Sequence, residues 1–181
     1  ISYASSSVAV SVNLNTNAVS GGDAAGDVIS GFENILGSAF NDMLTGDSSS
    51  NTITGGAGND LLTGAAGNDT IDGGTGSDTS VFSGNWANYT ITFNSGSSTY
   101  TIVDNRGASP DGTDIVTGVE HFQFADGTRT QADLVNAAPS DLVLTSGSQT
   151  NSQSIALAGY TSTAIVIDGT TDAAWANART Y

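Results

Sequence analysis

The sequence contains no cysteine and no lysine, and it has only two prolines, three arginines and one histidine among its 181 residues. Without cysteine there is no disulfide framework, no thiolate metal site and no cysteine nucleophile. The clustered positive charge that nucleic acids and anionic membrane surfaces require of a partner is missing as well. No apolar run approaches the roughly 18 residues of a membrane helix, so we expect no membrane span.

Acidic residues and glycine are abundant instead: 18 Asp and Glu give a formal net charge of -15, and there are 23 glycines. Small cations are the natural partners of such a surface. Val8, Val10, Val12 and Leu14 alternate along the chain as in a half-buried strand. Apolar residues at helical spacing are scarce, so we predict an all-β fold.

A nine-residue periodicity runs through the first half of the chain. Six units in the same register begin at Gly22, Gly37, Gly46, Gly55, Gly64 and Gly73. Position six of these units holds Asp27, Asp42, Asn51, Asp60, Asp69 and Asp78. Position eight is apolar in all but the last unit, with Ile29, Leu44, Ile53, Leu62, Ile71 and Ser80. Each unit is therefore expected to form one turn followed by one short strand, with position eight facing the interior.

The residue types within each unit suit a hard cation. Small residues at the first four positions permit tight turns with exposed carbonyl oxygens, and the aspartate adds an anionic oxygen. Calcium takes about six to eight oxygen ligands of these kinds. The candidate metal ligands are Asp27, Asp42, Asp60, Asp69 and Asp78, with the turn residues Gly55, Gly56, Gly58, Gly64, Gly67, Gly73, Gly74 and Gly76. The alternative is a series of ordinary β-turns, which favour the same residues.

The units resemble the RTX, or haemolysin-type, calcium-binding nonapeptide family, and the similarity is closest from Gly55 to Asp78. The resemblance implies a right-handed parallel β-roll in which two nonapeptides form one coil and turns 18 residues apart share an ion. It thereby pairs Asp42 with Asp60, Asn51 with Asp69, and Asp60 with Asp78, with about three to five calcium ions in all. It also implies a secreted bacterial protein, exported by type I secretion and folded by extracellular calcium.

A second repeat flanks the nonapeptides, because residues 27–35 recur in similar form as residues 114–122. We expect these segments to cap the roll, with Glu33 and Glu120 acting either as further calcium ligands or as acceptors for end-strand amides. Residues 89–102 read as a β-hairpin. An aromatic-packed cap is expected from Phe82, Trp86, Tyr89, Phe93, Tyr100, Phe122 and Phe124. Asp104, Asp111, Asp114 and Asp126 lie in turn-like settings, either as calcium ligands or as solvated residues.

Three regions are thus predicted: an RTX β-roll with an N-terminal capping strand (1–81), an aromatic-rich β cap (82–136), and a linker with the truncated start of a β-sandwich-like domain (137–181). The linker is placed at Ala137 to Ser140, where the composition shifts. The end of the sequence, from Ile167 to Trp175, resembles the opening of family 9 carbohydrate-binding modules. No carbohydrate-binding residue is assigned, and Trp175 is read as a core residue.

Catalysis is not expected from this chain. The single histidine, His121, lies on a predicted strand away from the apolar face, and neither G-x-S-x-G nor H-E-x-x-H occurs. The leading interpretation is a calcium-binding folding and stalk module of a secreted multidomain protein. The first alternative is the accessory tail of a hydrolase or lyase that reaches polysaccharide through adjacent domains. The second is a self-associating or ice-binding solenoid, suggested by Thr45, Thr54 and Thr63.

Overall fold

The computed structural model describes residues 1–108 and 110–135. These residues form a β structure with two short 3₁₀ turns and one short helix; the predicted linker and β-sandwich start at 137–181 lie outside the described residues. Among the described residues, no helix is long and apolar enough to cross a membrane. The elements are β1 (Ser11–Asn13), β2 (Ala18–Ser20), η1 (Gly22–Ala24), β3 (Asn34–Leu36), β4 (Met43–Thr45), β5 (Thr52–Ala57), β6 (Leu61–Thr63), β7 (Thr70–Thr75), β8 (Thr79–Val81), η2 (Trp86–Asn88), β9 (Tyr89–Asn94), β10 (Thr99–Asp104), β11 (Thr113–Thr117), β12 (His121–Phe124), β13 (Gly127–Thr130) and α1 (Gln131–Val135).

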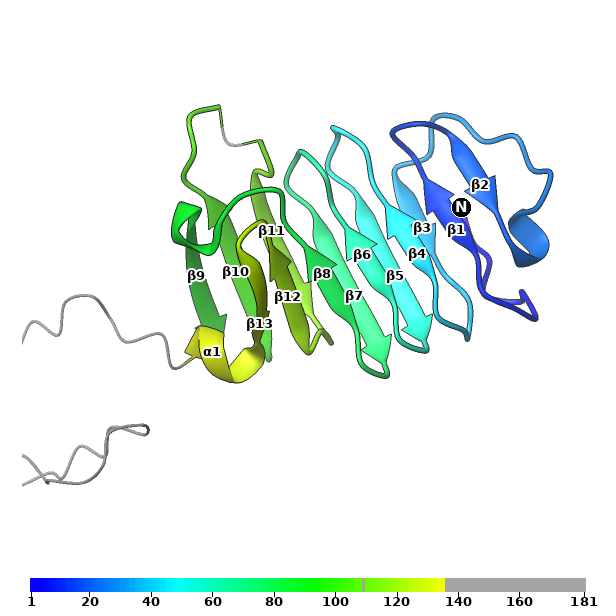
Figure 1. Cartoon of the computed structure of the whole chain (residues 1–181). Coiled ribbons are helices and arrows are strands. Elements are labelled where there is room, and N and C mark those ends of the chain that lie inside the picture. The colour runs from blue at the N-terminus through cyan, green and yellow to red at the C-terminus, as the bar shows by residue number, and fades with distance from the viewer. Residues whose placement is uncertain (109, 136–181) are drawn as a thin grey trace, which may run out of the picture. The chain divides into compact units, whose positions relative to one another are not determined.

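The strands form two sheets, and the chain alternates between them from β3 to β8 (Figure 1). One sheet has the order β13-β12-β8-β6-β4-β1-β2, and the other has the order β3-β5-β7-β11-β10-β9. Each nonapeptide from Gly37 onward supplies one strand, so that two consecutive units complete one coil. This is the roll of two nonapeptides per coil that the family resemblance implied.

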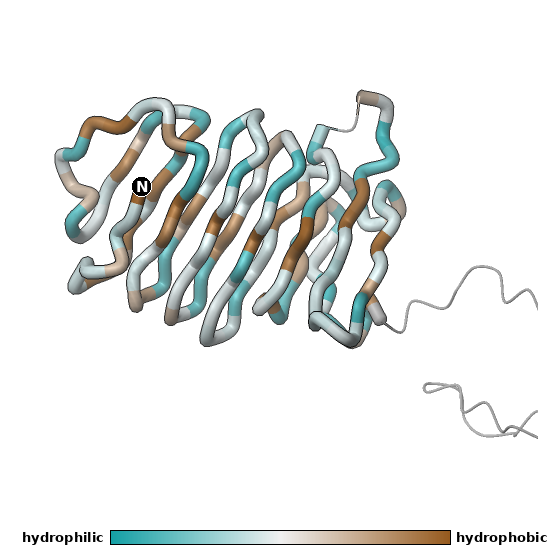
Figure 2. Tube along the Cα trace, turned by 180° about the vertical axis from the view of Figure 1, so that it is seen from behind, coloured by the Kyte–Doolittle hydropathy of each residue, from teal (hydrophilic) through white to brown (hydrophobic). Residues whose placement is uncertain are grey.

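The central strands pair in parallel with residues 18 positions apart, as in Ile53↔Ile71 and Leu44↔Leu62. The position-eight side chains consequently stack in columns between the two sheets, and Ile35, Leu44, Ile53 and Leu62 are at most 2% exposed. Figure 2 shows the hydrophobic segments recurring in the strands, with paler and hydrophilic segments in the turns. Alternating inward and outward side chains therefore give the roll its core.

The core column contains one polar exception, Ser80, which is fully buried between Leu62 and Phe122 in the strand register. Its hydroxyl group has no hydrogen-bond partner in the described structure. A small side chain at this point lies beside the large ring of Phe122, which is itself fully buried.

The sheets are mixed, because antiparallel strands close both ends of the parallel region. β1 pairs antiparallel with β2 at the N-terminal end, and β12 pairs antiparallel with β13 at the other end. The predicted hairpin is confirmed as β9 and β10, which pair from Tyr89↔Asp104 to Asn94↔Thr99. β11 then joins β10 antiparallel and β7 in parallel, which links the hairpin to the roll. The right-handed sense of the coil stays a prediction.

Aromatic side chains pack at the end that carries the hairpin. Phe82, Tyr89 and Phe124 form a mutual cluster with ring-centroid distances of 5.3 to 5.6 Å. Tyr100 contacts Phe122 at 4.9 Å. Two of the predicted cap residues lie nearer the surface: Trp86 stacks under Arg129, and Phe93 is 38% exposed.

Candidate metal centre

Position six of the units forms two rows of side chains, each connected by main-chain hydrogen bonds. The first carboxylate row is Asp42, Asp60, Asp78 and Glu120; each aspartate N–H donates to a carboxylate oxygen of the next member, at 2.8, 2.8 and 2.9 Å. The second row is Asn51, Asp69 and Asp114, with corresponding distances of 2.8 and 2.9 Å. The pairing of Asp42 with Asp60, Asn51 with Asp69 and Asp60 with Asp78 is the arrangement expected for turns 18 residues apart.

Position five adds hydrogen bonds that run in the opposite sense along the roll. The N–H of Asn59 donates to Oδ1 of Asn41 at 2.8 Å, and the N–H of Ser77 donates to Oδ1 of Asn59 at 3.0 Å. The carboxylates accept from the preceding coil, whereas these amides accept from the following coil. Together the two sets fix the register of successive turns, a role for Asn41 and Asn59 that the sequence analysis missed.

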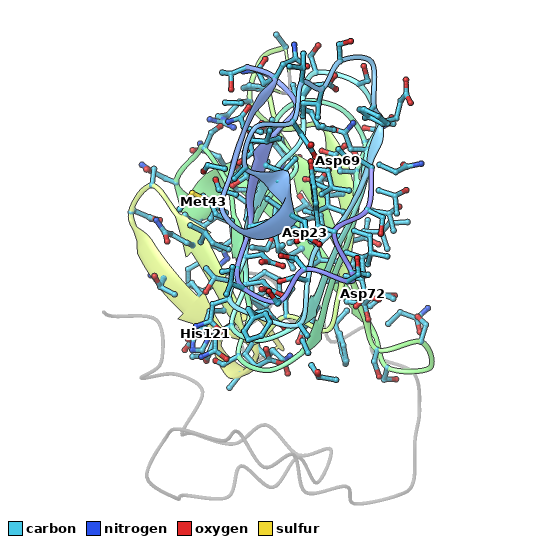
Figure 3. The ribbon with its side chains drawn as sticks, turned by 90° about the vertical axis from the view of Figure 1, so that its right-hand side faces the viewer. Asp23, Met43, Asp69, Asp72 and His121 are labelled. Carbon is cyan, nitrogen blue, oxygen red and sulfur yellow. The ribbon has the colours of Figure 1, made fainter. Side chains whose placement is uncertain are left out.

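The aspartates of both rows are withdrawn from water. Asp42, Asp60, Asp69 and Asp78 are at most 3% exposed. Burial raises the pKa of Asp60 and of Asp69 to about 6, and it also raises the pKa of Asp78. Stacked strands are about 4.8 Å apart, so successive carboxylates of a row repel one another as well. Figure 3, in which the N-terminal end of the roll faces the viewer, shows Met43 and Asp72 on opposite sides.

Among the described residues, three carboxylate oxygens are buried without any hydrogen-bond partner: Oδ2 of Asp60, of Asp69 and of Asp78. A buried anionic oxygen left without a partner is costly, and such groups in proteins are ordinarily paired or coordinate a metal. These three oxygens belong to the turns 55–60, 64–69 and 73–78, in which the nonapeptide pattern is strongest. Their donor chemistry, an anionic oxygen beside main-chain carbonyls, is that of a calcium site.

The glycines of these turns leave the space that the carboxylates use. A Cβ on Gly55 or Gly64 would overlap Oδ2 of Asp60 or Asp69, respectively, and a Cβ on Gly73 would lie 2.7 Å from Oδ2 of Asp78. Each partnerless oxygen therefore lies directly over the first glycine of its own turn. A larger residue at position one would fill this cradle.

The backbone conformation at position two distinguishes these three turns from the turns 37–42 and 46–51. It is left-handed in all three, with φ of 115° at Gly56, 72° at Ala65 and 96° at Gly74. Gly56, Gly58, Gly74 and Gly76 also approach the preceding coil so closely that a Cβ would meet a main-chain carbonyl. Glycine at these positions is consequently required by both conformation and space.

In the two earlier turns, protein groups form hydrogen bonds with the position-six side chain. At position two of the turn 37–42, the Ser38 N–H donates to Oδ2 of Asp42, and the Ser38 hydroxyl donates to Oδ1 at 2.8 Å. In the turn 46–51, the Asp47 N–H donates to Oδ1 of Asn51 at 2.8 Å, while the Asn51 amide donates to the Glu33 carbonyl at 3.0 Å. Both turns are closed by hydrogen bonds within the protein.

The metal-binding role of the predicted set stays a prediction, but its members are placed differently. Asp42, Asp60, Asp69 and Asp78 lie in the rows, whereas Asp27 is exposed, accepts a hydrogen bond from the Tyr3 hydroxyl at 2.9 Å, and lies in neither row. The register of this unit differs from the nine-residue count because Asn34, in β3, pairs with Thr52, which is position seven of its own unit. Glu33, the residue before Asn34, therefore occupies position six instead of Asp27.

The cap prediction for Glu120 is confirmed in its hydrogen-bonding form, because its carboxylate accepts the Asp78 N–H at the end of the first row. Glu33 instead presents its main-chain carbonyl to the Asn51 amide. Within residues 1–108 and 110–135, no three Asp, Glu or His side chains converge as a metal cluster. Most ligands of a bound cation would therefore be main-chain carbonyls, with carboxylates from the rows.

Comparison with known families identifies the repeats. The family of RTX calcium-binding nonapeptide repeats matches residues 22–61 and 45–79, with four copies. The comparison with curated proteins gives no match.

Proposed function

We propose that the chain is a calcium-ordered folding and stalk module of a secreted bacterial multidomain protein, on the premise that residues 22–79 match the family of RTX calcium-binding nonapeptide repeats. Calcium binds in the turns 55–60, 64–69 and 73–78 and orders the roll outside the cell. The observation that carries the proposal is the set of three buried, partnerless oxygens of Asp60, Asp69 and Asp78.

The charge of the chain makes calcium a strong influence on folding. A formal net charge of -15 and rows of buried carboxylates oppose compaction when no cation is bound. A ligand at 100 times its Kd stabilises the folded state by about 2.7 kcal/mol for each site. Three such sites supply roughly 8 kcal/mol, which is comparable to the total stability of an ordinary domain, about 5 to 15 kcal/mol.

The proposal is tested by calcium titration of the chain in chelated buffer, followed by circular dichroism. We expect little β signal without calcium and a cooperative gain with a midpoint between about 0.1 and 10 mM, the range of extracellular calcium modules. Magnesium is the matched control, because it demands a smaller octahedral shell and gives up its waters reluctantly. A full β spectrum in excess chelator, unchanged by calcium, contradicts the proposal.

A further inference from the structure

The second row continues beyond the matched repeats into the cap. The Asp69 N–H donates to Oδ1 of Asp114 at 2.9 Å, and the Thr113 N–H donates to Oδ1 of Asn68 at 2.9 Å, both across a separation of 45 residues instead of 18. The strand register agrees, because β11 pairs Val116 with Ile71. Residues from Gly112 to Thr117 thus take the place of the next nonapeptide, although the β9–β10 hairpin precedes them in the chain.

The local geometry at Gly112 repeats that of the nonapeptide turns. Gly112 is left-handed, with φ of 76°, and a Cβ on it would overlap the carbonyl oxygen of Gly67. Gly76 has the same relationship to the carbonyl oxygen of Gly58. Position four, position six at Asp114 and position eight at Val116 therefore coincide with those of a matched unit.

This junction brings buried negative charge together around an open space. Asp69 and Asp114 are 1% and 2% exposed, and Oδ2 of Asp69 has no partner. A cavity of about 100 Å³ is lined by Thr63, Gly64, Ala65, Phe82, Asp111 and Asp114. Oδ2 of Asp69 lies against Gly64, which is one of these lining residues. A cavity of this size has room for a cation.

The neighbouring cation is engaged elsewhere. Arg106 pairs with Asp104 at 2.7 Å and with Asp111 at 3.2 Å. Asp111 also accepts hydrogen bonds from the Ser83 N–H at 2.7 Å and from the Tyr89 hydroxyl. The carboxylates of Asp69 and Asp114 lie next to each other in the second row, and both are buried.

We infer that Asp69 and Asp114 bind a divalent cation between the roll and the cap, together with main-chain carbonyls of the turns that contain them. This inference rests on the calcium-binding function proposed above. The ion at this junction site, which we define by Asp69 and Asp114, joins a nonapeptide turn to a turn outside the matched repeats. Calcium consequently orders the hairpin cap along with the roll.

The test is the number of calcium ions bound by the whole chain in equilibrium dialysis. Asp114→Asn keeps an oxygen for the Asp69 N–H but removes the charge, so we expect it to bind about one ion fewer than the unmodified chain. Asp23→Asn is the control, because it removes the same charge at an exposed position. An equal ion count and equal affinity in Asp114→Asn and Asp23→Asn overturns the inference. Absence of calcium binding in the unmodified chain would instead refute the proposed function.

A second readout locates the ion. Terbium bound at the junction site would be excited through the aromatic cap, in which the Tyr89 hydroxyl donates to Asp111. We expect sensitised terbium emission from the unmodified chain, retention of that emission in Asp23→Asn, and its loss in Asp114→Asn. Calcium-induced circular dichroism of Asp114→Asn verifies that the roll still folds. No sensitised emission from the unmodified chain overturns the inference whatever the variants do.

Discussion

Replacing Asp60 by asparagine changes the charge at the centre of the first carboxylate row with little change in shape. Oδ1 of Asp60 accepts the Asp42 N–H at 2.8 Å, and its own N–H donates to Asp78 at 2.8 Å. Asparagine retains both hydrogen bonds. The difference falls on Oδ2, which is buried and partnerless and which we assign to calcium.

The size of the effect follows from the position of Asp60. Removing one member of a buried, paired set of charges costs about 3 to 5 kcal/mol. The lower figure corresponds to a rise in the calcium Kd of roughly 100-fold. Without calcium, the effect of the substitution on stability reverses, so Asp60→Asn should stabilise the folded chain. The reason is that burial raises the pKa of Asp60 to about 6, and Asp42 and Asp78 repel its charge. Neighbouring carboxylates at strand spacing repel by about 3 kcal/mol before salt screening.

The assay is a calcium titration of Asp60→Asn beside Asp72→Asn, followed by circular dichroism and calorimetry. Asp72 lies on an outer face and accepts only a local hydrogen bond from the Gly74 N–H at 3.1 Å. We expect the calcium midpoint of Asp60→Asn to rise by at least about tenfold, with more residual structure in chelator, and the midpoint of Asp72→Asn to stay unchanged. A purely structural role for Asp60 predicts lower stability with and without calcium. Equal midpoints for the two variants would refute the reasoning.

Three further predictions follow from the same geometry. Burial raises the pKa of Asp60 and Asp69 to about 6 in the folded chain, so protonation of these two carboxylates favours folding. Without calcium, the contribution of the two groups to stability should be complete below about pH 4 and should fall as the pH rises through about 6. Circular dichroism of chelated samples checks this, and stability that rises over this interval would be inconsistent with it. Asn51→Asp replaces the amide donor to the Glu33 carbonyl by a charged group, so the variant should lose about 1 to 3 kcal/mol of stability at low calcium. At high calcium the variant should bind an additional ion. Equilibrium dialysis counts the ions, and an unchanged number speaks against this prediction. Gly76 has φ of 139° and lies against the Gly58 carbonyl, whereas Gly26 has φ of 93° with open space around it. Gly76→Ala should therefore destabilise the calcium-bound chain far more than Gly26→Ala. Equal melting temperatures of the two variants would contradict this prediction.

The sequence was sufficient for the part of the roll whose determinants are local. Within one nonapeptide, glycine sets the turn, the aspartate closes it, and the apolar residue two positions later enters the core. The resemblance to the RTX family added two units per coil, from which stacking at an interval of 18 follows. The pairing of Asp42, Asp60 and Asp78 in one row could therefore be predicted before the structure was known, and the register confirms it.

The remaining features depend on contacts between distant segments. Asp114 could not be assigned to the second row because the hairpin breaks the nine-residue count, and only contacts in the folded chain reveal its place. Asp27 has the expected local spacing, yet the register of β3 puts Glu33 at position six instead. The hydrogen bond of the Asn51 amide depends on the Glu33 carbonyl one coil away, which no local pattern indicates.

Anomalous diffraction from crystals grown with calcium tests the central claim most directly, since it locates the ions without reference to a variant. We expect calcium peaks within coordination distance, about 2.3 to 2.6 Å, of Oδ2 of Asp60, of Asp69 and of Asp78, the three buried oxygens without partners among the described residues. Calcium-saturated crystals in which these three oxygens have no cation beside them would contradict it.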